Sequence, residues 1–277
     1  MTGTASAQEA QPEVFQPASA AQDAPAKNGG GPLSMLGSKG EKDQYLDITA
    51  DQSLEWHEDE SVYIARGHAK AKRGNTTITA DLLKAYNRKK PDGSSEVWKM
   101  TAEGNVHIID GQHEVTGDKG EYDIDTHKAT LTGENLRFTA GSDVVTAREA
   151  FVYDEAGSKI TARGGATAVR EGRQVQANEM VAYLAPNKTG GQDIDRMEAK
   201  GDVRIVTKED AALCDNAVYN LAKNNATLSG HVRLTRGQNQ LYGDKVEADF
   251  KTGRSRLINT GSGRVSALII GSKGKPG

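Results

Sequence analysis

Carboxylates recur in the chain directly after a small residue, about once every 30 residues. Such a column could bind calcium or supply general acids if its members met in space. Asn178 and Arg148 occupy the same slot in two units, which interrupts any ladder of identical ligands. Polar residues at a bend, where a short side chain satisfies the backbone, are the favoured interpretation. The column consists of Asp51, Asp81, Asp118, Asp215 and Asp244.

Other residue types that could carry chemistry lack the spacing that the chemistry needs. The six histidines form no HExxH or similar metal spacing, and His107 and His231 fall at outward strand positions. The glycine pairs at 164–165 and 190–191 lack the strand-to-helix setting of a phosphate loop. Cys214 fills a small-residue slot and is interpreted as a packing residue. We therefore expect no catalytic residues, no metal, no cofactor and no enzymatic activity.

Composition narrows the class of protein. The 277 residues carry a net charge of -3, without the basic excess of a nucleic-acid-binding protein. Aromatic residues are scarce at 5%, and no apolar run reaches the length of a membrane-spanning helix. The single cysteine excludes an internal disulfide framework.

Both ends of the chain differ from the middle. Residues 1–44 are rich in Ala, Gln, Pro and Gly, which predicts a disordered tail. Ala5-Ser6-Ala7 has the A-x-A form that signal peptidase leaves, although an Ala-rich linker has the same appearance. Residues 271–277 are expected to form a flexible C-terminal tail, which leaves 45–270 as one ordered domain.

Apolar and polar residues alternate through most of this domain. The segments 100–108 and 197–205 both place small or apolar residues at every second position. This period of two indicates strands with one buried face and one wet face. No stretch has sustained helical spacing, so the fold class is predicted to be all-β.

The strands belong to a repeat marked by an in-phase glycine. Seven two-strand units follow one another, which predicts about 14–16 antiparallel strands in a stacked array. Many equivalent positions lie 97 residues apart, as Ala129-Thr-Leu-Thr-Gly133 and Ala226-Thr-Leu-Ser-Gly230 illustrate. The domain is thus expected to be an internal duplication. The glycines are Gly67, Gly104, Gly133, Gly164, Gly201, Gly230 and Gly263 or its neighbour Gly261.

A glycine inside a strand normally marks a bulge, a bend or a close backbone approach. We expect the glycines to form one crease and the small-residue–Asp slots a second crease. Two creases and an apolar lining predict an open, folded-over β-jellyroll. A β-solenoid would give similar periodicity and remains open at this point.

The repeated cadence Ile78-Thr-Ala-Asp81…Tyr86 and Val115-Thr-Gly-Asp118…Tyr122 resembles the LptA/OstA-like family. The resemblance covers roughly residues 46–265. It implies a periplasmic protein that shields lipopolysaccharide acyl chains and bridges the inner and outer membranes during export. The absence of a following barrel and a preceding anchor favours the free bridge protein among the related modules.

The resemblance also implies an interior that binds acyl chains and end strands that pair with partners. The expected partners are lipopolysaccharide, the inner-membrane-anchored and outer-membrane transport components, and further copies in a head-to-tail oligomer, with no nucleic acid. The candidate groove residues are the inward-phase apolar ones: Met100, Val106, Ile108, Tyr122, Ile124, Leu131, Leu136, Phe138, Met197, Val203, Ile205, Tyr219, Leu221, Leu228, Val232 and Leu234.

Pattern alone fits other interpretations of these residues. They could form a dry, closed core, which is the usual meaning of inward apolar positions. Two further functions also remain: a structural scaffold of stacked β-units and a polysaccharide-acting β-solenoid, although no paired-carboxylate cluster supports the latter.

The expected docking edges are the uncharged segment 265–270 and the segment 47–50, because an exposed apolar edge strand is an aggregation hazard unless it is covered.

Overall fold

A computed structural model describes residues 46–268, apart from 112, 187–191, 209, 253 and 262–263. The expected tails at 1–44 and 271–277 lie outside these residues. The described chain contains eighteen strands and no helix, and hence no helix that could cross a membrane. The strands are β1 (Asp47–Thr49), β2 (Ser53–His57), β3 (Val62–Arg73), β4 (Thr76–Lys89), β5 (Ser95–Asp110), β6 (His113–Asp123), β7 (Lys128–Thr132), β8 (Leu136–Ala140), β9 (Asp143–Ala147), β10 (Ala150–Asp154), β11 (Lys159–Arg170), β12 (Arg173–Pro186), β13 (Gln192–Val206), β14 (Asp210–Asn220), β15 (Asn225–Arg236), β16 (Asn239–Asp249), β17 (Arg254–Ile258) and β18 (Ser266–Leu268).

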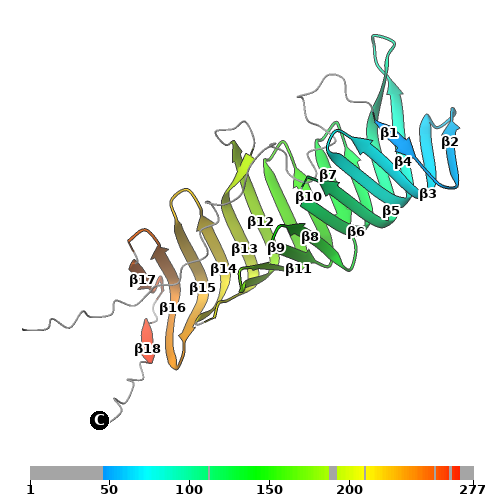
Figure 1. The fold of residues 1–277 in the computed structure, drawn as a ribbon. Helices are drawn as coiled ribbons and strands as arrows, with labels where there is room; N and C mark the ends of the chain where they lie inside the picture. The colour runs from blue at the N-terminus through cyan, green and yellow to red at the C-terminus, as the bar shows by residue number, and fades with distance from the viewer. Residues whose placement is uncertain are drawn as a thin grey trace, which may run out of the picture.

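All of these strands belong to one antiparallel sheet, so the predicted all-β class is confirmed. The chain runs back and forth in fourteen legs, of which four are split into two short strands each: β1–β2, β7–β8, β9–β10 and β17–β18. These splits explain why eighteen strands occur where 14–16 were predicted. Figure 1 shows the legs side by side, from the blue N-terminal end to the red C-terminal end. The antiparallel pairing excludes a solenoid of parallel coils for the described strands.

A single crease runs across every leg and divides the sheet into two leaves. We call the part that contains β1, β8, β9 and β18 leaf I, and the part that contains β2, β7, β10 and β17 leaf II; the long strands contribute to both. At the crease, two residues of one strand oppose one residue of its neighbour. Gly201 and Asp202, for example, lie opposite Asp215 between the pairs Lys200–Asn216 and Val203–Cys214. This arrangement is a β-bulge, which bends the sheet.

The prediction of two separate creases is therefore wrong. Glycine bulges and small-residue–Asp slots alternate along one line, because neighbouring antiparallel legs bring them into register. Gly104 and the following Asn105 both have positive φ, at 75° and 48°. Glycine adopts such a conformation without the steric cost that a β-carbon imposes.

The slot residues also fill the space beside the glycines. The carboxylate of Asp81 accepts a hydrogen bond from the Asn105 amide at 2.9 Å, and Asp215 contacts His231 at 2.8 Å. In the more C-terminal units, Asp244 accepts from the backbone N–H groups of Thr260 and Gly261. The last two contacts lower the pKa of the Asp244 carboxyl. The Asp column thus holds the bend, as the interpretation of polar crease residues predicted.

The core lies between the leaves and extends along the whole stack. Its fully buried side chains include Leu131, Leu136, Val106 and Val203. Much of the remainder is alanine, which lets the leaves close upon each other near the crease. A smaller, separate cluster of Ala226, Ala248 and Phe250 lies in the C-terminal legs.

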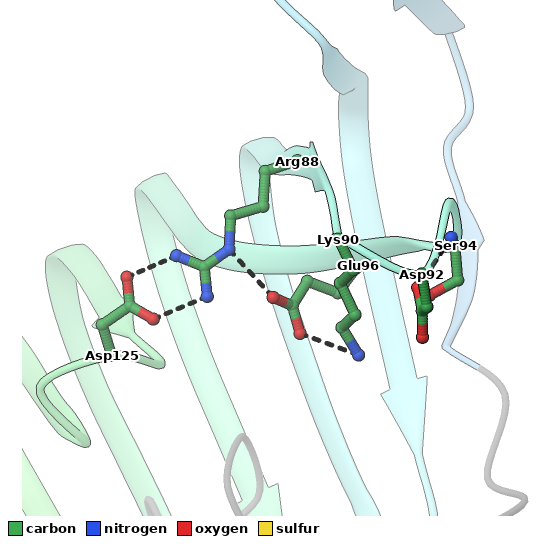
Figure 2. A network of polar contacts seen from close by, with 6 residues as sticks. All are labelled: Arg88, Lys90, Asp92, Ser94, Glu96 and Asp125. Carbon is green, nitrogen blue, oxygen red and sulfur yellow. Dashed lines mark hydrogen bonds and ion pairs between the residues drawn. The ribbon is translucent and has the colours of Figure 1, made fainter.

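The first long hairpin, β4–β5, extends beyond its neighbours (Figure 1) and is held by a polar network (Figure 2). The Arg88 guanidinium donates two hydrogen bonds to Asp125, at 2.6 and 2.7 Å, and a third to Glu96 at 2.9 Å. Lys90 adds an ion pair to Glu96 at 3.0 Å. The Arg88 hydrogen bond lowers the pKa of the Asp125 carboxyl. The network ties the hairpin to the turn that follows β6.

Candidate functional site

The inner faces of both leaves carry cross-strand rows of apolar side chains, and in leaf I a polar row that runs through Arg73, Thr76, Asp110 and His113 borders them at the strand ends. One apolar row, which we call the long inner row, crosses all fourteen legs of leaf I from β1 to β18. Every member is apolar. In order of pairing, the row is Ile48, Ala71, Ile78, Ile108, Val115, Phe138, Val145, Ala168, Val175, Ile205, Ala212, Leu234, Leu241 and Ala267.

The structure places thirteen of the sixteen predicted groove residues in or against the main core. Ten are buried: Met100, Val106, Ile108, Tyr122, Leu131, Leu136, Val203, Ile205, Leu228 and Val232. Three half-buried residues, Ile124, Phe138 and Leu234, pack against the main core. Tyr219 packs instead against the small C-terminal cluster, and Met197 and Leu221 are half-buried. Contact with a lipid remains a prediction for all of them.

Five of these residues line one apolar cavity of about 30 Å³ in the N-terminal half of the stack: Met100, Val106, Ile108, Tyr122 and Leu131. A space of this size holds no more than about one water molecule. The two leaves are therefore closely packed around this cavity.

Burial sets the protonation of the polar groups in the interior. It raises the pKa of Tyr122, raises that of Tyr153 to about 12, and raises that of the Cys214 thiol to about 11. These groups stay neutral at physiological pH. A protonated, buried Cys214 agrees with its interpretation as a packing residue.

The Tyr122 hydroxyl is buried and has no hydrogen-bond partner among the described residues. A buried donor without a partner loses its hydration at a cost of about 1–3 kcal/mol. We expect Tyr122→Phe to leave the free energy of unfolding unchanged or to raise it by about 1 kcal/mol in urea titrations. Tyr219→Phe is the matched control, because the Tyr219 hydroxyl donates to Asn224 Oδ1 at 3.0 Å. That variant should lose about 0.5–1.5 kcal/mol; an equal loss in Tyr122→Phe would contradict this account.

Sequence reasoning missed several members of the long inner row, among them Ile78, Val115, Val145 and Val175. Alternation alone does not find them, because the inward phase changes at each Asp slot. In β6, Val115 faces inward before Asp118, and Tyr122 faces inward after it, with two outward residues in succession at the slot. The Asp slot itself is the signal that could have located the change of phase.

The interior is open at its N-terminal end. Leu54 and Trp56 of β2 lie in register with Ala65 and Tyr63, on the inner face of leaf II. Leu54, Trp56 and Tyr63 are 57%, 46% and 42% exposed, and the two aromatic rings are 4.4 Å apart. Apolar inner-face side chains thus meet solvent at the first legs.

Five of the six histidines contact a carboxylate, and His113 stacks on the Phe138 ring. His107 Nε2 lies 2.7 Å from Glu114, and His68 Nδ1 lies 3.2 Å from Asp51. No group of three or more His, Cys, Asp or Glu side chains suited to a metal occurs in the described part of the chain. The Asp column is spread along the crease and does not converge on one point.

The comparisons with known proteins agree with the repeat. The model of the LptA and LptD N-terminal domain, a lipopolysaccharide transport protein, matches residues 47–153 and again residues 146–254. The two matched segments begin 99 residues apart, close to the 97-residue period of the predicted duplication. No curated protein matched the chain.

Among solved structures, the chain was aligned with LptH, the LptA homologous periplasmic component of the lipopolysaccharide transport device from Pseudomonas aeruginosa. That alignment covers 82% of this chain and 96% of LptH at 13% identity, with a TM-score of 0.20, too loose to inform the site. The family model, by contrast, matches well over half of the sequence, in register with its repeat. The chain belongs to the family of LptA and LptD N-terminal-domain lipopolysaccharide transport proteins.

Proposed function

We propose that this protein carries lipopolysaccharide through the periplasm and shields its acyl chains between the two leaves. It thereby bridges the inner and outer membranes. The long inner row is the observation that carries the proposal. Strands lie about 4.8 Å apart, so a row across fourteen legs offers an unbroken apolar path of about 60 Å.

The ends of this path favour transport over a closed core. A closed core covers its apolar side chains at every margin, yet Leu54, Trp56 and Tyr63 are exposed at the N-terminal mouth. The row also reaches the edge strands β1 and β18, each of which pairs with one neighbour only among the described strands. A partner module that added a strand there would extend the path.

An acyl chain enters by separation of the leaves, since the cavity between them is small. Small residues make this separation easy near the crease, where Ala69, Ala80, Ala166 and Ala177 form paired inner positions. Short side chains interdigitate little, so the contact between the leaves is shallow. The bulges act as a continuous hinge for this opening.

Site-specific crosslinking tests the proposal. We expect a photo-crosslinker at Ile108 or Ile205, both in the long inner row, to capture lipopolysaccharide in a producing host. The matched controls are His107 and Arg204, which precede these residues and face outward. The readout is a lipopolysaccharide-positive band on the immunoblot of the purified protein.

The inner and control positions test opposite faces of the sheet, because adjacent residues of a strand point to opposite faces. Capture at the inner positions alone supports the proposal. Equal capture at both faces, or capture at the outer face only, contradicts it. Mass spectrometry of lipid retained by the purified wild-type protein then identifies the lipid form.

A further inference from the structure

A cavity opens at the crease, lined by outward-facing polar side chains and by the core residues Leu136, Ala147, Ala166 and Ala177. Its volume is about 700 Å³, and residues 134–137, 146–148, 165–167, 176–178 and 202 line it. Its polar lining includes Arg137, Thr146, Arg148, Thr167, Gln176 and Asn178. We call it the crease hollow.

Four of these residues form one outward row of leaf I. Arg137 pairs with Thr146, Thr146 with Thr167, and Thr167 with Gln176, across β8, β9, β11 and β12. The regular sheet therefore fixes their spacing. A volume of about 700 Å³ falls in the range of small-molecule sites, well above the size of one ion.

The crease is exceptional at this place. Arg148 occupies the slot that holds an aspartate or asparagine in the other units. Gly165 is the residue that follows the bulge glycine, and the equivalent residues in other units are His68, Asn105, Asp202 and His231. The two changes depend on each other. A β-carbon at position 165 would lie 2.7 Å from a terminal nitrogen of Arg148. Glycine thus leaves the space that the guanidinium fills.

The two guanidinium groups face the hollow with most of their donors unused. Arg148 lies two residues beyond Thr146, the partner of Arg137, so the arginines are diagonal neighbours. The only described acceptor for either is the Gly164 carbonyl, 3.4 Å from Arg148 Nε. Some arginines of the chain are paired, as Arg163 is with Glu179 at 2.8 Å, whereas Arg173 Nη1 is buried without a hydrogen-bond partner among the described residues.

Two carboxylates also line the hollow, but neither neutralises an arginine directly. Asp202 accepts a hydrogen bond from the Asn178 amide at 3.0 Å. No described carboxylate, Glu134 included, lies within 4 Å of Arg137 or Arg148. Each guanidinium offers five donors in a planar fork that matches a phosphate or carboxylate group.

We propose that the crease hollow binds a phosphate group through Arg137 and Arg148. Planar recognition of phosphate oxygens by arginine is strong because the hydrogen bonds are charge-assisted and paired. The surrounding amides and hydroxyls of Gln176, Asn178 and Thr167 suit the hydroxyl groups of a sugar that carries the phosphate. The proposed phosphate contacts come from outward-facing side chains, so this proposal does not rest on the lipid-carrying function.

Calorimetric titration of the full chain tests this site with inorganic phosphate, glucose 1-phosphate and glucose. We expect saturable binding of the two phosphate compounds and none of glucose. Arg137→Gln and Arg148→Gln should each weaken binding at least about tenfold, since a hydrogen bond to a charged group contributes more than one tenfold step. Arg204→Gln is the matched control, because Arg204 lies on the same outward face, beyond the hollow.

Urea melts verify that all variants are folded, and Arg148→Lys, which keeps the charge without the fork, should bind between wild type and Arg148→Gln. Tighter binding of glucose 1-phosphate identifies a sugar phosphate as the ligand, and equal binding identifies free phosphate. Absence of saturable phosphate binding, or unchanged binding in both glutamine variants, overturns the proposal. Lipid capture at the inner face is measured separately, so failure of either proposal is distinguishable from failure of the other.

Discussion

Replacement of Gly201 by valine is expected to destabilise the protein by about 2–5 kcal/mol, the sum of two separate costs. Gly201 has φ +74°, a left-handed conformation that costs an L-residue about 1–2 kcal/mol. Its β-carbon would lie 2.6 Å from the Asn178 amide nitrogen, an overpacked contact that costs about a further 1–3 kcal/mol. The free energy of unfolding, measured in urea, checks the value.

Gly172 provides the matched control. It has nearly the same φ, +76°, but a β-carbon there would meet no atom within 4 Å. Gly172→Val should therefore show only the conformational cost. We also expect Asn178→Ala to recover part of the loss in Gly201→Ala, since it removes the side chain that the new β-carbon meets. Equal losses in Gly172→Val and Gly201→Val, together with additivity of the alanine changes, would exclude a close approach at the crease.

The class of fold could be read from the sequence because alternation and repetition are local signals. The segment 100–108 keeps its phase through Gly104, so Met100, Val106 and Ile108 were placed correctly on one face. The 97-residue spacing behind the predicted duplication is a local pattern of the same kind. In the structure, single extra residues, Trp98 and Asp195, interrupt the strand register 97 positions apart.

The single crease could not be read from the sequence, because it depends on which residues oppose each other across strands. Gly67 and Asp81 lie fourteen positions apart in the chain, and only the register of β3 with β4 brings them together. Arg148 was recognised as an exception to the column. Its relation to Gly165 and Arg137 required the positions of three strands, and so the crease hollow was not predicted.

The free margins of the sheet determine whether copies or partner modules can join it. The C-terminal strand β18 pairs with β16 through Ser266, Ala267 and Leu268. The segment predicted as a docking edge thus lies on its own sheet, as its last described strand; Ile269 and Ile270 lie outside the described residues. Leu268 is 54% exposed, and the strand carries no charge. Unpaired backbone groups on such an edge can receive a further strand.

We expect one of two proline variants, Ala267→Pro or Leu268→Pro, to abolish concentration-dependent oligomers while the monomer stays folded. The N–H groups of consecutive residues point to opposite sides of a strand, so one variant removes a donor toward β16 and the other removes a donor toward the free edge. Sedimentation velocity over a range of protein concentrations measures the oligomers, and circular dichroism verifies the fold.

Leu213→Lys is a control that distinguishes oligomers formed by pairing of edge strands from oligomers formed by contact between exposed apolar surfaces. Leu213 is 42% exposed on the outer face of leaf I, away from both edges, so its replacement should leave the oligomers unchanged. Leu54→Glu places a charge on the inner face of the opposite edge strand, where head-to-tail pairing would bury it, and should dissociate them. Oligomers that persist in both proline variants and in Leu54→Glu would contradict docking through the edges. Oligomers lost in Leu213→Lys would locate the contact on the outer face of leaf I instead.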